Sequence, residues 1–176
     1  MGMTLITTNT SSNAATSDFT SSIDSTYKFY IFKFHDVNPA TDAVQFGFQA
    51  NASGQSGYNE TIHSTCFRGY MTEAGSVAIG YETDGDLAQG TGLQPITLLT
   101  GNGGDESGAG ELFLFNPSNT TYTTHFYSRA TEYHRDDRVN NIYTSGHFNV
   151  TAAITNIQFK MSSGNMDAVI SMYGVG

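Results

Sequence analysis

Residues 27–37 read YKFYIFKFHDV, and this stretch decides the fold class of the chain. Its aromatic and β-branched side chains favour an extended backbone, because they pack well on a pleated, half-buried surface. No segment of about 12 residues repeats its apolar side chains with the 3.6-residue period of a helix. Further extended segments are predicted on the C-terminal side of this stretch, at residues 44–50, 60–71, 93–100, 111–116, 121–133 and 142–150.

The clearest hairpin pattern lies at residues 154–173. Residues 154–161 and 166–173 both alternate apolar with polar side chains, and the turn-like SSGN at residues 162–165 separates them. Residues 72–92 hold five glycines among mixed side chains, and we expect them to form a long surface excursion. Eight or nine strands divided by turn residues predict an all-β fold, an antiparallel β-sandwich of the jelly-roll type.

The division of the chain follows from where the apolar residues begin. Residues 1–18 are mostly small and polar, so we predict an extended N-terminal arm there. Residues 19–176 carry the aromatic side chains and the strand patterns, and we predict that they form a single β-sandwich domain. A total of 176 residues fits one domain of ordinary size.

The charge balance excludes two classes of partner. Seven basic and 16 acidic side chains give a net charge of −9, and such a chain repels phosphate backbones and anionic lipid surfaces. We therefore expect neither nucleic acid nor a membrane as a partner. No apolar run exceeds four residues, so no transmembrane helix is predicted either.

No recognisable catalytic or metal-binding motif stands in the sequence. Cys66 is the single cysteine, which leaves no common zinc framework, and the acidic loops lack the alternating oxygen donors of a calcium loop. We expect no catalytic residues, no cofactor, no metal site and no enzymatic activity; a polysaccharide-cleaving enzyme is the open alternative. The five histidines show no metal-ligand spacing and are interpreted as isolated strand residues: His35, His63, His125, His134 and His147.

One segment concentrates aromatic and ionic side chains. Aromatic rings can stack on the apolar faces of sugars, while arginine and carboxylate groups bond hydroxyls, so this segment is a candidate partner- or glycan-binding patch. The alternative is a solvated loop whose opposite charges offset each other. The candidate residues are Tyr127, Arg129, Tyr133, His134 and Arg135.

The aromatic stretch at 27–37 also predicts a contact surface. A sandwich strand has one inner face, so the rings on its other face must meet solvent, the arm or a neighbouring subunit. We expect the outer set, either Phe29 with Ile31 or Tyr30 with Phe32, to lie under the arm or in an oligomer interface. The alternative is that the 72–92 excursion covers this face within one subunit.

Four segments of the sequence share one further property. They begin at Asp18 (DFTSSIDSTYKFYIFKFHDVNPATDAVQFGFQANA) and continue with SGYNETIHSTCFRGY at 56–70, GELFLFNPSNTTY at 110–122 and IQFKMSSGNMDAVISMYG at 157–174. In this order they resemble a small structural module of marine tailed-bacteriophage virion proteins, which are capsid-associated or tail-fibre-like. The resemblance brings no catalytic residues with it.

This resemblance implies a non-enzymatic virion structural protein, made in the host bacterial cytoplasm and carried on the virion surface. We expect a capsid decoration or cement protein that forms a homo-oligomer, a trimer, and contacts the major capsid protein or other virion proteins. The alternative is a tail-fibre or tail-tip adhesin that binds host surface glycans.

Overall fold

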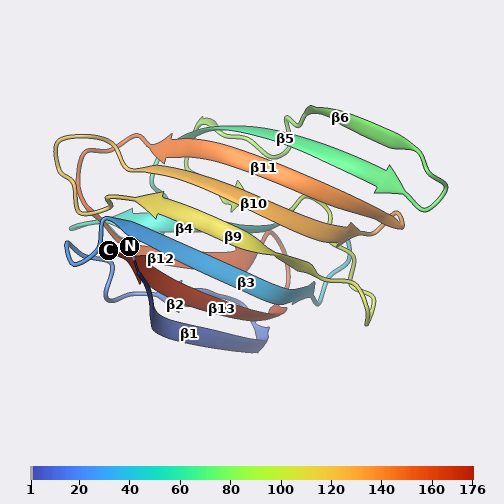
Figure 1. Cartoon of the computed structure of the whole chain (residues 1–176), viewed down its shortest axis with the longest axis horizontal. Helices are drawn as coiled ribbons and strands as arrows, with labels where there is room; N and C mark the ends of the chain where they lie inside the picture. Colours follow the sequence, from blue (N-terminus) through green and yellow to red (C-terminus); the bar gives the residue numbers. More distant parts are fainter. Residues whose placement is uncertain (1) are drawn as a thin grey trace.

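Two antiparallel β-sheets make up the computed structural model, which describes residues 2–176 (Figure 1). The predicted all-β sandwich is confirmed. The larger sheet contains, in spatial order, β1 (Met3–Ala14), β13 (Met166–Val175), β3 (Phe29–Pro39), β9 (Gly108–Phe115), β10 (His125–His134), β11 (Arg138–Phe148), β5 (Ile62–Thr72) and β6 (Val77–Tyr81), with β7 (Ala88–Gly90) also pairing with β5. The smaller sheet contains β2 (Ser17–Phe19), β12 (Ile154–Met161), β4 (Phe46–Ala52) and β8 (Gln94–Pro95). The jelly-roll form of the sandwich is not confirmed by these strand orders.

Within residues 2–176 there is no helix with the length and apolar character needed to cross a membrane.

The core lies between the two sheets and is built mainly of phenylalanine rings. Alternation along each strand turns one set of side chains inward, and these sets meet in the space between the layers. Phe159 on β12 lies at its centre, with ring centroids 5.4 Å from Phe32, 5.8 Å from Phe46 and 6.0 Å from Phe19. Its side chain is fully buried, so this cluster holds the small sheet against the large one.

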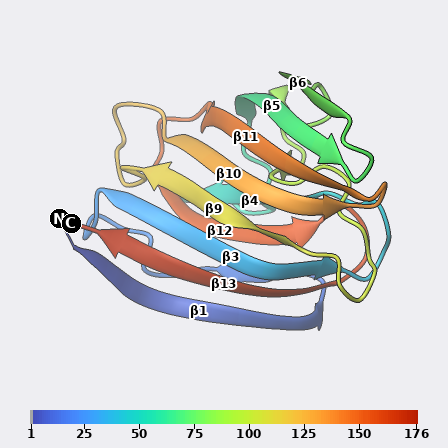
Figure 2. The ribbon, with the colours of Figure 1, turned by 45° about the vertical axis from the view of Figure 1, so that its right-hand side comes forward.

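The N-terminal segment is an edge strand of the larger sheet. β1 pairs antiparallel with β13 from Met3↔Val175 to Ala14↔Met166, and β2 follows it directly on the smaller sheet. Figure 2 shows β1 and β13 side by side, with the two ends of the chain together at one corner. The segment is extended, and the backbone partner of β1 is a strand of the same chain.

The hairpin predicted from 154–161 and 166–173 is wrong, although both strands exist. β12 pairs with β2 and β4 in the smaller sheet, whereas β13 pairs with β1 and β3 in the larger sheet. Residues 162–165 therefore pass from one layer to the other. Apolar and polar side chains alternate in both strands because each strand turns one face to the same core. The same alternation is expected for two strands paired in a hairpin and for two strands in opposite layers of a sandwich.

Two neighbouring regions also differ from their predictions. Only Gln94–Pro95 of residues 93–100 pairs as a strand, because the amides of Ile96 and Thr97 both donate to the carbonyl of Phe46 and break the ladder. The predicted excursion at 72–92 contains β6 and β7, which extend the larger sheet beside β5. β9, β10, β11 and β5 separate β6 from β3, so this segment does not cover the outer face of β3.

Candidate functional site

The side of the larger sheet that faces away from the core is the candidate binding surface, here called the outer face. Antiparallel register places its side chains in rows that cross the strands. The first row is Phe29, Phe115, His125, His147 and His63. The second row is Ile31, Phe113, Tyr127, Ser145 and Thr65, and the third is Lys33, Glu111, Arg129, Tyr143 and Phe67.

Four rings on β3, β9 and β10 form an aromatic cluster on this face: Phe29, Phe113, Phe115 and Tyr127. Phe113 and Tyr127 stack with ring centroids 4.4 Å apart and an interplanar angle of 17°. Phe115 lies 5.6 Å from Tyr127 and 5.5 Å from Phe29. Tyr127 is 41% exposed, so the cluster offers a ring to a ligand or partner. Partial burial and then Glu111 raise the pKa of the Tyr127 phenol, which keeps its hydroxyl protonated.

Charged side chains follow directly beside the aromatic cluster in the third row. Lys33 Nζ lies 3.5 Å from Glu111 Oε2, and the guanidinium of Arg129 lies 5.5 Å from the ring centroid of Tyr143. A hollow of about 490 Å³ opens here, lined in part by Lys33, Glu111 and Arg129. The outer face thus places stacking rings next to hydrogen-bonding charges.

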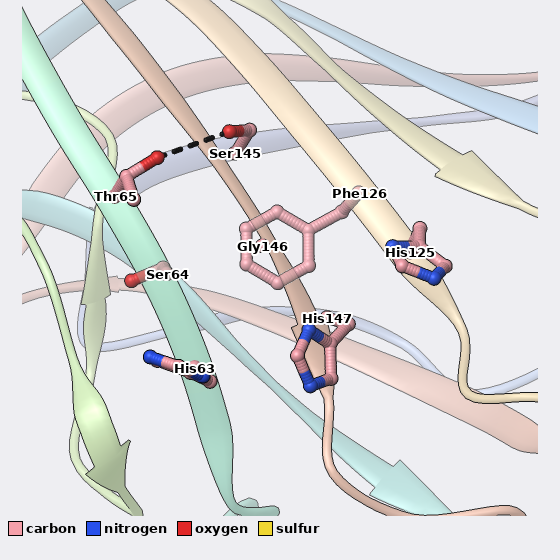
Figure 3. A pocket seen from close by; sticks show the side chains of 8 residues that line it. All are labelled: His63, Ser64, Thr65, His125, Phe126, Ser145, Gly146 and His147. Atoms are coloured by element: carbon pink, nitrogen blue, oxygen red, sulfur yellow. Dashed lines mark hydrogen bonds between the residues drawn. The ribbon is translucent and has the colours of Figure 1, made fainter.

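Three histidines form a second feature of the outer face, the histidine row: His63 on β5, His125 on β10 and His147 on β11. His147 is the middle ring, with centroids 5.5 Å from His125 and 5.7 Å from His63. They line a hollow of about 340 Å³, and Figure 3 shows the three rings on neighbouring strands around it. Partial burial, with smaller contributions from His125 and His63, lowers the pKa of His147.

The far edge of the larger sheet carries an exposed apolar surface, the β5–β6 patch. Val77 is 65% exposed and Ile79 is 80% exposed, and in the described part of the chain β6 pairs with a neighbouring strand on one side only. Register places Phe67 opposite Tyr81 and Met71 opposite Val77, so these side chains share the outer face. The patch consists of Phe67, Met71, Val77, Ile79 and Tyr81.

The structure divides the patch predicted around residues 127–135. Tyr127, Arg129 and Tyr133 lie on the outer face of β10, and Arg135 is exposed in the turn between β10 and β11. His134 points the other way and is fully buried. The predicted residues therefore do not form one surface.

His134 has a structural environment. Arg138 Nη2 lies 2.8 Å from His134 Nε2, and because a guanidinium group only donates, this ring nitrogen must accept. Burial first, and then the charge of Arg138, lowers the pKa of His134 to about 4. The buried ring is therefore neutral at neutral pH.

The aromatic residues of β3 divide as alternation requires. Tyr30 and Phe32 are fully buried in the core, so they offer no surface to another subunit. Phe29 and Ile31 are half-buried on the outer face, where Phe29 belongs to the aromatic cluster. Phe29 and Ile31 thus remain the candidate contact pair on this strand.

Cys66 and the acidic residues build no reactive site among residues 2–176. Cys66 is fully buried, and burial raises the pKa of its thiol. In the described part of the chain, no group of three or more His, Cys, Asp or Glu residues is arranged to hold a metal ion.

Comparison with known proteins adds no identification. No protein-family model matches the chain, and a search of curated proteins finds no match.

Proposed function

We propose that the chain is a non-enzymatic structural protein of a bacteriophage surface, a capsid decoration or cement protein that assembles with copies of itself. The observation that carries the assembly part is the β5–β6 patch, where Ile79 is 80% exposed on an edge strand. The sequence segments that resemble virion structural modules support the location on a virion.

An exposed apolar edge strand favours association. The outer side of such a strand offers unpaired N–H and C=O groups, and natural monomers protect it with charges, proline or bulges. β6 has the sequence VAIGY, which contains none of these protective residues, and its exposed side chains are large and apolar. Burying one such side chain contributes roughly 1.5–3 kcal/mol, so several of them can hold subunits together.

The two free edges of the larger sheet suggest how copies would meet. β1 and β6 are the outermost strands, and exposed Met3 and Leu5 lie on β1. Pairing of β6 with β1 of the next subunit is a head-to-tail contact, which generates a ring when the rotation closes. We propose a trimer, which suits the local three-fold positions of an icosahedral shell and brings the ring against the major capsid protein.

Analytical ultracentrifugation of the pure protein tests this proposal. We expect a complex of three 19.0 kDa subunits, and a folded monomer for the variant Ile79→Lys. Tyr122→Lys is the matched control, because Tyr122 is 72% exposed but lies in the loop between β9 and β10. A wild-type monomer at micromolar concentration, or an Ile79→Lys variant that still assembles, contradicts the proposal. Absence of the protein from purified phage heads contradicts the assignment to the capsid surface.

The aromatic cluster favours a second candidate function, a tail-fibre or tail-tip adhesin that binds host surface glycans. The Phe113–Tyr127 stack lies beside Lys33, Glu111 and Arg129, and sugar recognition uses this combination of stacking rings and hydrogen-bonding charges. A glycan array distinguishes the two functions: an adhesin binds, and Tyr127→Ala abolishes binding, while Ile79→Lys does not. Turnover of host polysaccharide by the pure protein would instead identify an enzyme.

A further inference from the structure

The histidine row differs from the other surface features because all three of its side chains are imidazoles, whose nitrogen atoms can coordinate a metal ion. His125 faces His147 on the neighbouring strand, and His147 faces His63 on the next. The amide of Phe148 donates to the carbonyl of Thr124 at 3.0 Å, just beyond the first pair. This bond makes His125 and His147 a non-hydrogen-bonded pair, the type in which opposing side chains approach most closely.

The spacing of the rings matches that of two imidazoles on one ion. A zinc–nitrogen bond of ~2.1 Å and a tetrahedral angle place the centroids of two ligating rings about 5 Å apart. The observed separations are 5.5 Å for His125–His147 and 5.7 Å for His147–His63, within reach of a small side-chain rotation. Figure 3 shows no hydrogen bond between these rings and the other residues that line the hollow.

We propose that His147, together with either His125 or His63, binds one divalent transition-metal ion such as Zn²⁺ in this hollow. Because His147 belongs to both pairs, only one pair can hold an ion at a time, and each chain therefore binds one ion. The donors are imidazole nitrogens alone, which suit Zn²⁺, Ni²⁺ and Cu²⁺ and not the oxygen-seeking Ca²⁺ or Mg²⁺.

A two-ligand site agrees with the absence of three-residue metal sites among residues 2–176. His125 and His63 lie two strands apart, about 10 Å at the usual spacing between strands, which is too far to share one ion. The remaining coordination positions are open to water or to a donor atom from another molecule. An ion bound here could therefore link the outer face to a partner.

Isothermal titration calorimetry of the full chain with ZnCl₂ tests the proposal, with CaCl₂ as the comparison ion. We expect one Zn²⁺ per chain and no heat of binding for Ca²⁺. His147→Ala and the double variant His63→Ala/His125→Ala should each weaken Zn²⁺ binding by about tenfold or more, since a single imidazole remains a poor site. Each single variant, His63→Ala or His125→Ala, should weaken it only about twofold, because one pair survives.

His35→Ala is the matched control, because His35 is exposed on the outer face and bonds Asp36 instead. Its Zn²⁺ affinity should equal that of the wild type. As a measurement that needs no variant, the ring signals of His147 in an NMR titration should move with Zn²⁺ while those of His35 stay unchanged. No saturable Zn²⁺ binding, binding that survives His147→Ala, or equal loss in His35→Ala would each overturn the proposal.

Discussion

Glu132 is a buried carboxylate on which the packing of one loop depends, and its removal gives a prediction that can be worked out bond by bond. The side chain is 1% exposed on the inner face of β10. Oε2 accepts hydrogen bonds from the Leu98 amide and from the Thr100 hydroxyl, both at 2.9 Å. Oε1 accepts one from Asn140 Nδ2 at 2.6 Å and a longer one from the Leu99 amide at 3.4 Å.

Glu132→Ala leaves two fully buried donors without an acceptor. The Thr100 hydroxyl keeps its bond to Thr97 Oγ1, and the Leu99 amide is only partly buried. The Leu98 amide and Asn140 Nδ2 are buried and have no other acceptor among residues 2–176. Each unsatisfied buried donor costs about 1–3 kcal/mol, so we expect a loss of about 4 kcal/mol. For a domain of this size the loss lowers the Tm by about 8–16 °C.

Glu132→Gln should cost only about 1 kcal/mol, because its new NH₂ group can occupy the Oε1 position. Asn140 Oδ1 is buried and has no hydrogen-bond partner within residues 2–176, and rotation of the Asn140 amide would present this oxygen to the new donor. Thermal and urea unfolding followed by circular dichroism measure both variants. Equal losses of unfolding free energy in Glu132→Ala and Glu132→Gln would show that the charge of the carboxylate, and not the number of unsatisfied donors, determines the stability. A loss of less than about 1 kcal/mol for Ala would refute the reasoning outright.

Three further predictions concern the pH response and the core. The pKa of His134 lies at about 4 in the fold against 6.5 for the free side chain, so the unfolded chain binds more protons between these values. Stability must therefore fall as the pH drops through this window, and urea melts should show a smaller fall for His134→Gln. Phe159→Ala should cost about 3–5 kcal/mol in urea unfolding because the ring is fully buried, whereas Phe67→Ala, on the exposed patch, should leave the urea midpoint nearly unchanged. A Cβ on Gly110 would meet the backbone of β10, so Gly110→Ala should lower the Tm sharply, while Gly92→Ala, with open space around it, should not.

Local pattern was sufficient to predict most strands. Residues 154–161 coincide with β12, and the aromatic stretch at 27–37 lies within two residues of β3 at each end. The failed hairpin shows the limit of this information. Alternation records that a strand has one buried face, but both layers of a sandwich bury their faces in the same core. Which sheet receives a strand depends on partners far along the chain.

The candidate sites depended even more on distant partners. His63, His125 and His147 are adjacent only through the register of β5, β10 and β11, which no local spacing encodes. The β5–β6 patch did have a signal, because Val77, Ile79 and Tyr81 alternate in VAIGY. The glycines around it led to the prediction of an irregular excursion. The sequence also could not show which of Tyr30 and Phe29 points into the core, because this depends on which side of β3 the second sheet lies.

The placement of β13 between β1 and β3 also determines when the larger sheet can complete its folding during translation. Both neighbours of β13 leave the ribosome long before it does, since residues 3–14 and 29–39 precede residues 166–175. At about 5–20 residues per second, β3 waits on the order of ten seconds for this partner. During that time one side of an aromatic-rich strand is open to other nascent chains. We therefore expect folding yield in the cell to respond to translation speed and to chaperone supply, even for variants whose final stability is unchanged.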